Sequence, residues 1–244
     1  MTTKKGDGDM EKDYGLIRGD RLGWGISIGF IATYLGLSIA IMMVVMLVGL
    51  FVFGPDQVDL IFQMQYTSYI DAVSFLLAYL IFKGVRDALK DQYSLEPMKQ
   101  LSTYGYIVGS VGLIYLSQFI IIDLLTLEEA GSQVDLFGLG DINLTTVNVL
   151  LISGVFIIIA PLLEEVLFRG FIFGFLAEKL GLTVGFIASS VIFGLLHPGH
   201  ILSATIMGFI ITGVYYKTRT LWAPILLHLI WNSIATYSLL SLVF

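Results

Sequence analysis

The stretch VNVLLISGVFIIIAPLLEEVLFRGFIFGFLA, residues 147–177, decides the fold because it is almost entirely apolar and yet has three charged side chains near its middle. A helix of this length would measure about 46 Å at about 1.5 Å per residue, whereas the hydrocarbon core of a bilayer is about 30 Å thick. The stretch therefore predicts a membrane helix that is too long for one straight crossing. Pro161 within it predicts a kink or a break into two pieces.

The rest of the chain has the same apolar character. Its 244 residues are 57% hydrophobic and 13% charged, and the mean hydropathy is +0.88, which excludes the surface of an ordinary soluble domain. A membrane barrel would show period-two alternation in segments of about ten residues, whereas long unbroken apolar runs dominate here. We therefore predict an all-α fold, a single polytopic bundle of transmembrane helices.

Seven stretches are apolar enough to be membrane helices. They lie at residues 22–53, 66–82, 104–122, 147–177, 182–196, 201–216 and 221–244. A break at Pro161 would add an eighth segment. The first stretch would form a helix of about 48 Å, so we expect it to be tilted, interrupted at its glycines or partly interfacial, and we interpret it as an uncleaved anchor. The chain is thus divided into a polar tail over 1–21, N-terminal membrane helices and loops over 22–146, and a C-terminal membrane core over 147–244.

The distribution of basic residues predicts the orientation in the membrane. Twelve of the thirteen Lys and Arg residues fall in the tail or in loops on the same side, namely at positions 4, 5, 12, 18, 21, 83, 86, 90, 99, 179, 217 and 219. The opposite loops, 54–65 and 126–144, have acidic residues and no basic ones. Because positive residues are retained in cytoplasmic loops, we predict a multi-pass protein of the cell membrane with a cytoplasmic N-terminus and an external C-terminus.

Composition also excludes several kinds of partner and chemistry. The net charge is −6, and the sequence has no basic patch, which excludes a nucleic-acid partner. Cysteine is absent, so there is no disulfide, no thiolate metal site and no cysteine nucleophile. The partners that we expect are the lipid bilayer and a peptide or membrane-protein substrate.

The charged residues inside the fourth stretch are candidates for function, because an ionisable side chain at membrane depth is costly unless it is paired or faces water. Glu165 and Arg169 are four residues apart and share a helical face, so a structural ion pair that fixes helix packing is the simpler interpretation for them. Glu164 points about 100° away from this face. A second acid is unnecessary for such a pair, which favours a general base or acid at Glu164.

The three histidines lie in the last quarter of the chain. His197 follows Phe193 by one helical turn at the end of the fifth stretch, and we interpret His200 as a helix cap or an interface group. His228 and Asn232 are four residues apart and project from the same side of the last stretch. Interhelical hydrogen bonding is an equally good explanation of this last pair taken alone.

Taken together, one free carboxylate, two imidazoles and an amide form a set that has no counterpart in the first three stretches, where Asp71 and Asp123 lie near the estimated helix ends. Such a set can deprotonate water and stabilise an oxyanion, as peptide hydrolysis requires. It also offers three zinc ligands, Glu164, His197 and His228. Helical rise from the cytoplasmic edge places His228 at about 10 Å and His197 at about 22 Å. We expect the site in the cytoplasmic half of the membrane, with the connection after His197 lining a cavity.

Three motifs in this part of the chain occur in a fixed order. The pattern E-E-x-x-x-R is found at Glu164, Glu165 and Arg169, F-x-x-x-H at Phe193 and His197, and H-x-x-x-N at His228 and Asn232. In these motifs residues 147–244 resemble the CPBP family of intramembrane proteases, which comprises type II CAAX prenyl endopeptidases and bacterial relatives linked to bacteriocin processing and immunity, also called Abi proteins.

The resemblance implies a role for each of these positions. Glu164 would activate a water with the help of His197, and His228 and Asn232 would stabilise the oxyanion. Three further residues would support or shape the site, namely Glu165, Arg169 and Phe193. The family has been described both as metalloproteases and as metal-free glutamate proteases. We favour the metal-free form, without a cofactor, because the histidines lack a compact zinc-binding spacing such as H-E-x-x-H, and zinc remains the alternative.

Two other functions are compatible with the sequence. One is a non-catalytic membrane scaffold or bacteriocin-immunity protein that keeps the constellation for stability. The other is a proton-coupled transporter in which Glu164 and the histidines form a relay. The hydropathy shows no inverted repeat, and the buried ionisable groups are confined to one half of the chain, which favours the endopeptidase.

Overall fold

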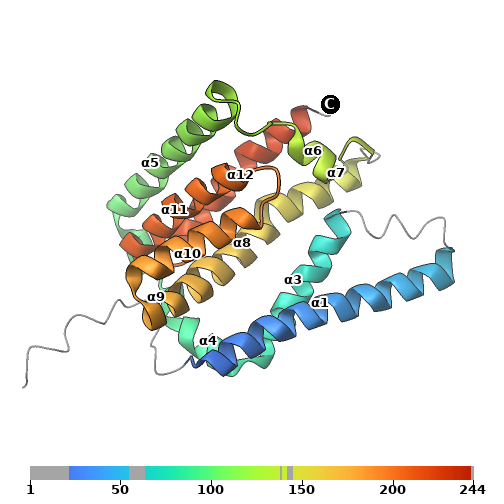
Figure 1. Cartoon of the computed structure of the whole chain (residues 1–244), viewed down its shortest axis with the longest axis horizontal. Coiled ribbons are helices and arrows are strands. Elements are labelled where there is room, and N and C mark those ends of the chain that lie inside the picture. The colour runs from blue at the N-terminus through green and yellow to red at the C-terminus, as the bar shows by residue number, and fades with distance from the viewer. Residues whose placement is uncertain (1–21, 55–63, 138, 142–144, 243–244) are drawn as a thin grey trace, which may run out of the picture.

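The computed structural model describes residues 22–54, 64–137, 139–141 and 145–242. Within these ranges the regular elements are helices and no strand occurs (Figure 1). The predicted all-α membrane fold is confirmed. The polar tail over 1–21 lies outside the described residues.

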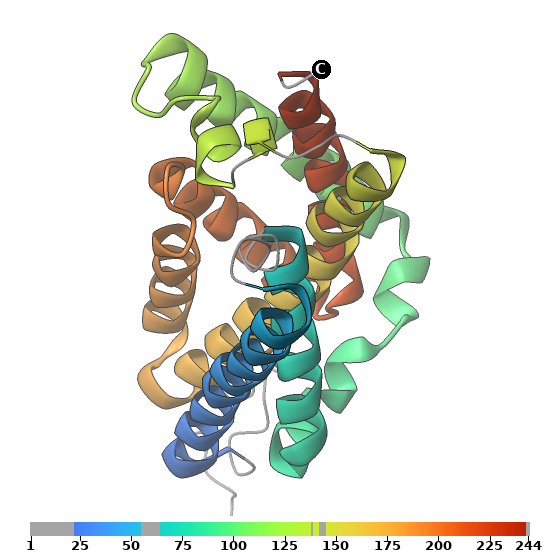
Figure 2. The same cartoon turned by 90° about the vertical axis from the view of Figure 1, so that its right-hand side faces the viewer.

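The N-terminal part consists of two long helices and a bend. α1 (Trp24–Phe53) is one uninterrupted helix, and it ends at Gly54, whose φ of +80° suits glycine. α3 (Met64–Ile81) packs beside α1, as both views show (Figure 2). The chain then turns by 92° into α4 (Lys83–Leu89) and two short 3-10 helices, Lys90–Tyr93 and Glu96–Lys99.

The helix after this bend, α5 (Leu101–Gln118), leads to a connection at the end of the bundle opposite α4 (Figure 1). It continues into a π-helical segment, Phe119–Leu124. The connection that follows contains α6 (Ser132–Leu136) and a 3-10 turn, Leu139–Asp141.

The stretch that decides the fold forms one continuous helix over Thr146–Leu180. Thr145 caps its first segment, since the Thr145 Oγ1 accepts a 3.2 Å hydrogen bond from the Asn148 amide. We call this continuous helix the long helix. Its successive segments are α7 (Thr146–Ser153), the first π segment of this helix (Gly154–Ile159), α8 (Ala160–Glu164), the second π segment of this helix (Glu165–Phe173) and α9 (Gly174–Leu180).

The break that we predicted at Pro161, and with it the eighth segment, is absent from this described helix. Pro161 lies in the first turn of α8, directly after the first π segment. A π turn leaves room before the proline ring and lets neighbouring backbone groups find other partners. The helix therefore passes the proline without breaking.

Three helices complete the bundle: α10 (Leu182–Leu195), α11 (Ile201–Thr218) and α12 (Trp222–Ser241). Each of the seven predicted apolar stretches contains a helix in its described residues, but a count of seven membrane spans is not confirmed. In the described part of the chain, five helices are long and apolar enough to cross a membrane, or six if the bent pair around residue 82 is one span. α10 has 14 residues and falls short of the length of the others.

The buried clusters join the two halves of the sequence. Phe30 of α1 packs against Phe75 of α3 and, at 4.9 Å between ring centroids, against Phe171 of the long helix. Ile107 and Ile114 of α5 pack against α11 and α12. Large apolar side chains of α1, α3 and α5 remain exposed on the outside of the bundle, as expected for surfaces that face lipid. Residues from both sides of position 146 therefore contribute to the same buried clusters.

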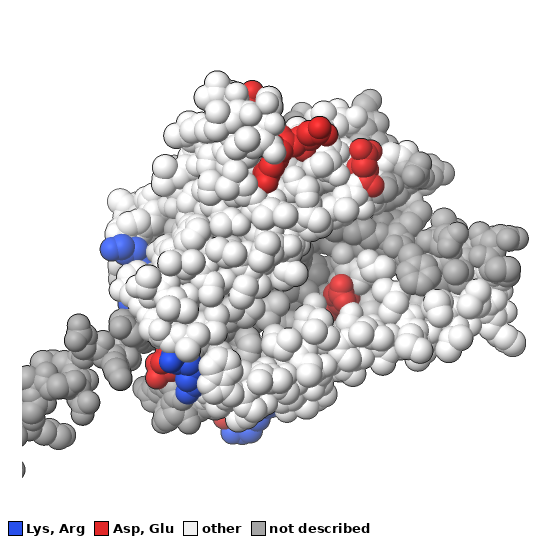
Figure 3. All heavy atoms as spheres, in the orientation of Figure 1, with Lys and Arg blue, Asp and Glu red and all other residues white. Residues whose placement is uncertain are grey.

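The two ends of the bundle differ in charge. Among the described residues, every Lys and Arg except Arg169 lies in segments 82–100, 178–181 and 217–221, which we call the basic end. Segment 123–145 and the C-terminal end of α12 form the opposite, acidic end. The described part of that end contains Asp and Glu but no Lys or Arg. Figure 3 shows Lys and Arg near α4 and α9 and a group of Asp and Glu at the far side.

Candidate active site

A buried ion pair lies at the base of the site. Arg169 Nη1 donates a 2.8 Å hydrogen bond to Glu165 Oε1, and both side chains are fully buried. The guanidinium also donates to the carbonyl of Gly208 at 3.4 Å and lies 4.4 Å from the ring centroid of Phe193. The ion pair expected from the four-residue spacing is thus present, and it connects the long helix to α10 and α11.

Glu165 has a second partner that the sequence did not indicate. Its Oε1 also accepts a 2.6 Å hydrogen bond from His228 Nδ1 of α12. Donation of the Nδ1 proton to this carboxylate orients the ring and leaves Nε2 directed towards Glu164, 3.8 Å away. Glu165 therefore bonds to both Arg169 and His228, so its role is wider than the structural ion pair expected from the sequence.

Glu164 faces both imidazoles. Its Oε2 lies 3.8 Å from His228 Nε2 and 4.0 Å from His197 Nε2. About a quarter of its side chain is exposed, in contrast to the buried Glu165 next to it. These distances are too long for direct hydrogen bonds and suit a water held between the groups. The structure therefore brings together three of the residues predicted to form the site.

Phe193 positions His197 in two ways. The Nδ1 of His197 lies 2.6 Å from the carbonyl oxygen of Phe193, and the two rings lie 4.4 Å apart. Phe193 itself is buried between His197, Arg169 and Phe168. The bond at Nδ1 leaves Nε2 of His197 to face the carboxylate of Glu164.

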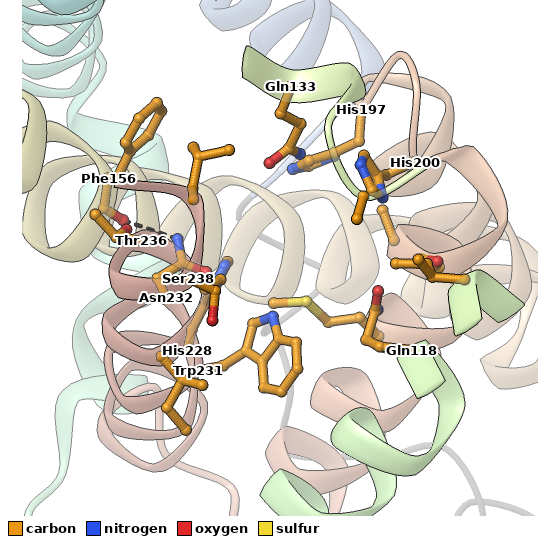
Figure 4. A pocket seen from close by; sticks show the side chains of 18 of the residues that line it. Gln118, Gln133, Phe156, His197, His200, His228, Trp231, Asn232, Thr236 and Ser238 are labelled. Carbon is orange, nitrogen blue, oxygen red and sulfur yellow. Dashed lines mark hydrogen bonds between the residues drawn. The ribbon is translucent and has the colours of Figure 1, made fainter. Parts of the chain in front are cut away.

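Asn232 completes the predicted set. Its Nδ2 donates a 2.8 Å hydrogen bond to the carbonyl of Phe156 in the first π segment (Figure 4). An amide nitrogen carries two hydrogens, so one remains for another acceptor. His228 and Asn232 both reach the cavity from α12. The first π segment thus supplies an oxygen that orients the amide, a contact that the motif does not predict.

These residues lie in a cavity of about 570 Å³. Figure 4 shows His228, Trp231 and Asn232 on α12 along one side, with His197 and His200 on the loop across it. The remaining walls come from the end of α5, from α6 and from the first turns of α11. The cavity extends from Glu164 towards the acidic end of the bundle.

His200 binds to the connection that follows α5. Its Nε2 lies 3.0 Å from Ser132 Oγ, and its Nδ1 lies 3.8 Å from Glu128 Oε2. Glu128 also accepts hydrogen bonds from the amides of Leu202 at 2.6 Å and Ser203 at 3.2 Å, so it caps α11. Burial lowers the pKa of His200, and the Glu128 carboxylate opposes that shift. The interface interpretation of His200 agrees with these contacts.

Asp71 is an intramembrane carboxylate whose position the sequence did not predict correctly. We expected it near the end of its helix, but it lies well inside α3 and accepts a hydrogen bond from Ser38 of α1. An ionisable residue within an apolar run was the signal available in the sequence.

The three possible zinc ligands do not form a metal cluster. Glu164 faces His197 and His228 at 4.0 and 3.8 Å, but no group of three or more His, Cys, Asp or Glu side chains in the described ranges is arranged to hold a metal ion. We therefore derive no step through a metal.

Comparison with known proteins concerns the segment that contains these residues. Residues 146–234 match the family model described as "Type II CAAX prenyl endopeptidase Rce1-like". This segment is Rce1-like. It contains every residue of the three motifs and confirms the resemblance drawn from them. No solved structure gave a significant match.

Two curated relatives share part of the chain. "Putative membrane peptidase YdiL" of Bacillus subtilis (strain 168) is 44% identical over 78 residues, which are 31% of this chain and 32% of that protein. "UPF0177 protein YxdF" of Lactococcus lactis subsp. lactis (strain IL1403) is 43% identical over 74 residues, which are 29% of this chain and 40% of that protein. The similarity thus spans between about a third and two fifths of the length of these relatives. The Rce1-like family description is that of a membrane endopeptidase.

Proposed function

We propose that this chain is an intramembrane endopeptidase that hydrolyses peptide bonds of a membrane-associated peptide or protein. The observation that carries the proposal is the Glu164 carboxylate, which faces the Nε2 atoms of His197 and His228 inside a cavity of the Rce1-like segment. An acid that is partly accessible and close to two imidazoles is suited to activate water.

The reaction begins with the water between Glu164 and His197. Glu164 accepts a proton from it while the water oxygen attacks the carbonyl carbon of the scissile bond, and His197 Nε2 holds the water in place. The C–N bond then breaks, and Glu164 returns the proton to the leaving amine. The products are a new carboxylate and a new amine, so that no other reactant is required.

The charge that develops on the carbonyl oxygen is stabilised from α12. Protonated at both nitrogens, His228 donates from Nε2 to the oxyanion while its Nδ1 keeps the 2.6 Å hydrogen bond to Glu165. The free hydrogen of Asn232 Nδ2 is the second donor. Glu165 stabilises the imidazolium, and Arg169 holds Glu165 in place. Removing one such donor from an oxyanion site lowers kcat by about 100-fold to 1,000-fold.

The substrate is a pheromone- or bacteriocin-type peptide, and a CAAX-type substrate is the alternative that the prenylated peptides below test. The protein itself spans the cell membrane with a cytoplasmic N-terminus. The distribution of Lys and Arg supports this orientation. No metal is needed in the mechanism above, in which the acid and the imidazoles act directly. Zinc at Glu164, His197 and His228 is the alternative that the experiment below distinguishes.

The test is cleavage of quenched peptides, prenylated and unprenylated, by detergent-purified protein with and without a strong chelator. We expect cleavage by the wild type in both conditions. Loss of cleavage is expected for Glu164→Gln, His197→Ala and His228→Ala, with normal amounts of protein in the membrane. Cleavage that the chelator abolishes and zinc restores would replace the metal-free mechanism. Cleavage that persists in Glu164→Gln would refute the proposed role of this residue.

A further inference from the structure

The cavity reaches only one end of the bundle. On the long helix its walls are Phe156, Ala160 and Glu164, so they extend from Glu164 towards the start of that helix at the acidic end. On α12 they begin at His228 and continue to Leu239, and Leu242 directly after the helix also lines the cavity. On both helices, therefore, the lining lies on the acidic side of the catalytic residue.

The other walls agree with this direction. α11 contributes residues of its first two turns, the last of which is Met207. α5 and its π extension contribute only their later part, from Tyr115 to Asp123. No described residue of the basic end, in segments 82–100, 178–181 and 217–221, lines the cavity.

The described side chains below the catalytic residues close the path to the basic end. Glu165, Arg169 and Phe193 are buried directly beneath the site. A further buried cluster, which includes Phe173 and Tyr215, fills the space between the long helix, α11 and α12 beyond them. Packing of this kind leaves no room for a peptide.

The opening at the acidic end is fixed in place. Glu128 caps α11 and Ser132 contacts His200, so the connection after α5 is held against the loop that carries His197. Gln133, one residue further along this connection, lines the cavity (Figure 4). The mouth is therefore built from the same segments that position the catalytic histidine.

The walls also indicate the chemistry of the occupant. Apolar and aromatic side chains such as Phe119, Phe137 and Trp231 predominate, with the amides of Gln118 and Gln133 between them. Apolar walls with a few polar groups are typical of sites that bind mainly through burial and are oriented by hydrogen bonds. An extended peptide offers apolar side chains to such walls and backbone groups to the amides.

We infer that the substrate of this site is an apolar peptide segment that enters from the acidic end of the bundle, which the distribution of Lys and Arg places on the external side of the membrane. That this peptide segment is a substrate rests on the proposed function. The direction of access rests only on the cavity and the charges, and it differs from the expectation that the site lies in the cytoplasmic half of the membrane.

The absence of cysteine allows a direct test by single-cysteine labelling. The probes are Gln133→Cys at the mouth, Ala235→Cys on α12 and Ala160→Cys, four residues before Glu164, all of which line the cavity. A polar, membrane-impermeant maleimide is added to intact cells, and the same labelling is repeated after permeabilisation. A thiol reacts as a thiolate, which requires contact with water.

Two matched controls define the result. Ala40→Cys lies in the middle of α1 on an exposed surface that faces lipid, and Lys83→Cys lies at the basic end with an exposed side chain. We expect the three cavity cysteines to be labelled in intact cells, Lys83→Cys only after permeabilisation, and Ala40→Cys in neither case. Labelling of Lys83→Cys in intact cells, with the cavity cysteines labelled only after permeabilisation, would overturn the inference. Failure of the cavity cysteines to react in both conditions, or labelling of Gln133→Cys but not of Ala160→Cys in intact cells, would also overturn it.

A second measurement separates the direction of access from the activity. Cells with Ala235→Cys are treated with the impermeant maleimide, and cleavage of an externally added apolar peptide is measured. We expect the modification to abolish cleavage, with the untreated variant and the treated wild type both active. Labelling from outside without any peptide cleavage by either protein would retain the direction of access and refute the proposed endopeptidase. Full cleavage after complete modification would refute the route.

Discussion

Glu165 is the residue on which the site depends most, although it is not the acid that meets the water. One oxygen of its carboxylate accepts from both Arg169 and His228, and the side chain is fully buried. A buried carboxylate with two cationic or polar partners is stable only while they remain, because an uncompensated charge has no water to solvate it. The Glu165 side chain therefore contributes to both the stability of the protein and the geometry of the site.

This arrangement predicts different behaviour for the two adjacent acids. Glu165→Ala leaves Arg169 buried without its partner, so we expect the free energy of unfolding to fall by about 3–5 kcal/mol, together with loss of turnover. Glu164→Gln keeps the shape of a partly accessible side chain, so we expect turnover to be lost with little change in thermal stability. Thermal unfolding in detergent and peptide cleavage measure the two effects.

The double variant Glu165→Leu with Arg169→Met is the control. It removes both buried charges, and apolar replacements of a buried ion pair are often neutral for stability. We expect stability to recover relative to Glu165→Ala but turnover to remain absent, since His228 still lacks its acceptor. Recovery of turnover in the double variant would contradict the positioning role of Glu165.

At this scale the sequence predicted contacts within one helix but not those between helices. The Glu165–Arg169 pair follows from the geometry of a single helical turn. The bond from His228 to Glu165 joins residues 63 positions apart, and its existence depends on how α12 packs against the long helix. The same limitation explains why the contact of Asn232 with Phe156 was missed.

At the scale of elements, α10 and α11 are held together by close contacts at small residues. A Cβ at Gly208 would lie 3.0 Å from the carbonyl oxygen and 3.1 Å from the Cα of Ser190. The carbonyl of Gly208 also accepts a hydrogen bond from Arg169. Small residues allow helix backbones to approach closely in membranes. The packing at Gly208 therefore fixes the position of α11 relative to Arg169 at the base of the site.

Gly208→Ala and Gly213→Ala provide a matched pair on α11. In Gly208→Ala the added methyl group must push α10 away, and we expect destabilisation of about 1–3 kcal/mol with reduced turnover. In Gly213→Ala the nearest atom is 3.9 Å away, so we expect unchanged or slightly raised stability, because alanine favours a helix by about 1 kcal/mol over glycine. Thermal unfolding and cleavage measure both variants. Equal destabilisation of the two would contradict the proposed packing role of Gly208.

The sequence predicted the helices better than it predicted their role as membrane spans. Apolar runs marked every long helix, because lipid requires such runs along a crossing. The bend after α3 depended on tertiary packing instead. The short apolar run at 182–196, in contrast, already predicted a helix as short as α10. The continuity of the helix at Pro161 came from a π segment, a deviation that needs only one wider turn and leaves no distinct pattern in composition.

At the scale of the whole molecule, the Rce1-like segment is not packed as an independent unit. Phe171 and Phe175 belong to the same buried cluster as residues of α1, α3 and α4, and α5 packs against α11 and α12. The family match begins at residue 146, whereas the packed core includes helices on both sides of that point. The N-terminal helices therefore complete the fold of the segment that carries the motifs.

This packing predicts the behaviour of the protein when it is cut. We expect residues 145–244 expressed alone to be degraded and inactive, because removal of α1, α3 and α5 leaves their buried partners without contacts. Co-expression with residues 1–144 should restore both accumulation and cleavage, since helices inserted separately can associate by packing. Copurification of the tagged fragments and peptide cleavage are the measurements.

Two substitutions in α1 test whether such assembly depends on the observed contacts. Phe30 is fully buried against Phe171, whereas Leu35 on the same helix is half exposed on the outer surface. Phe30→Ala in the 1–144 fragment should reduce copurification with 145–244 because it removes the ring from the joint cluster, and Leu35→Ala should leave it unchanged. Accumulation of an active 145–244 fragment without its partner would show instead that residues 147–244 form a self-sufficient domain.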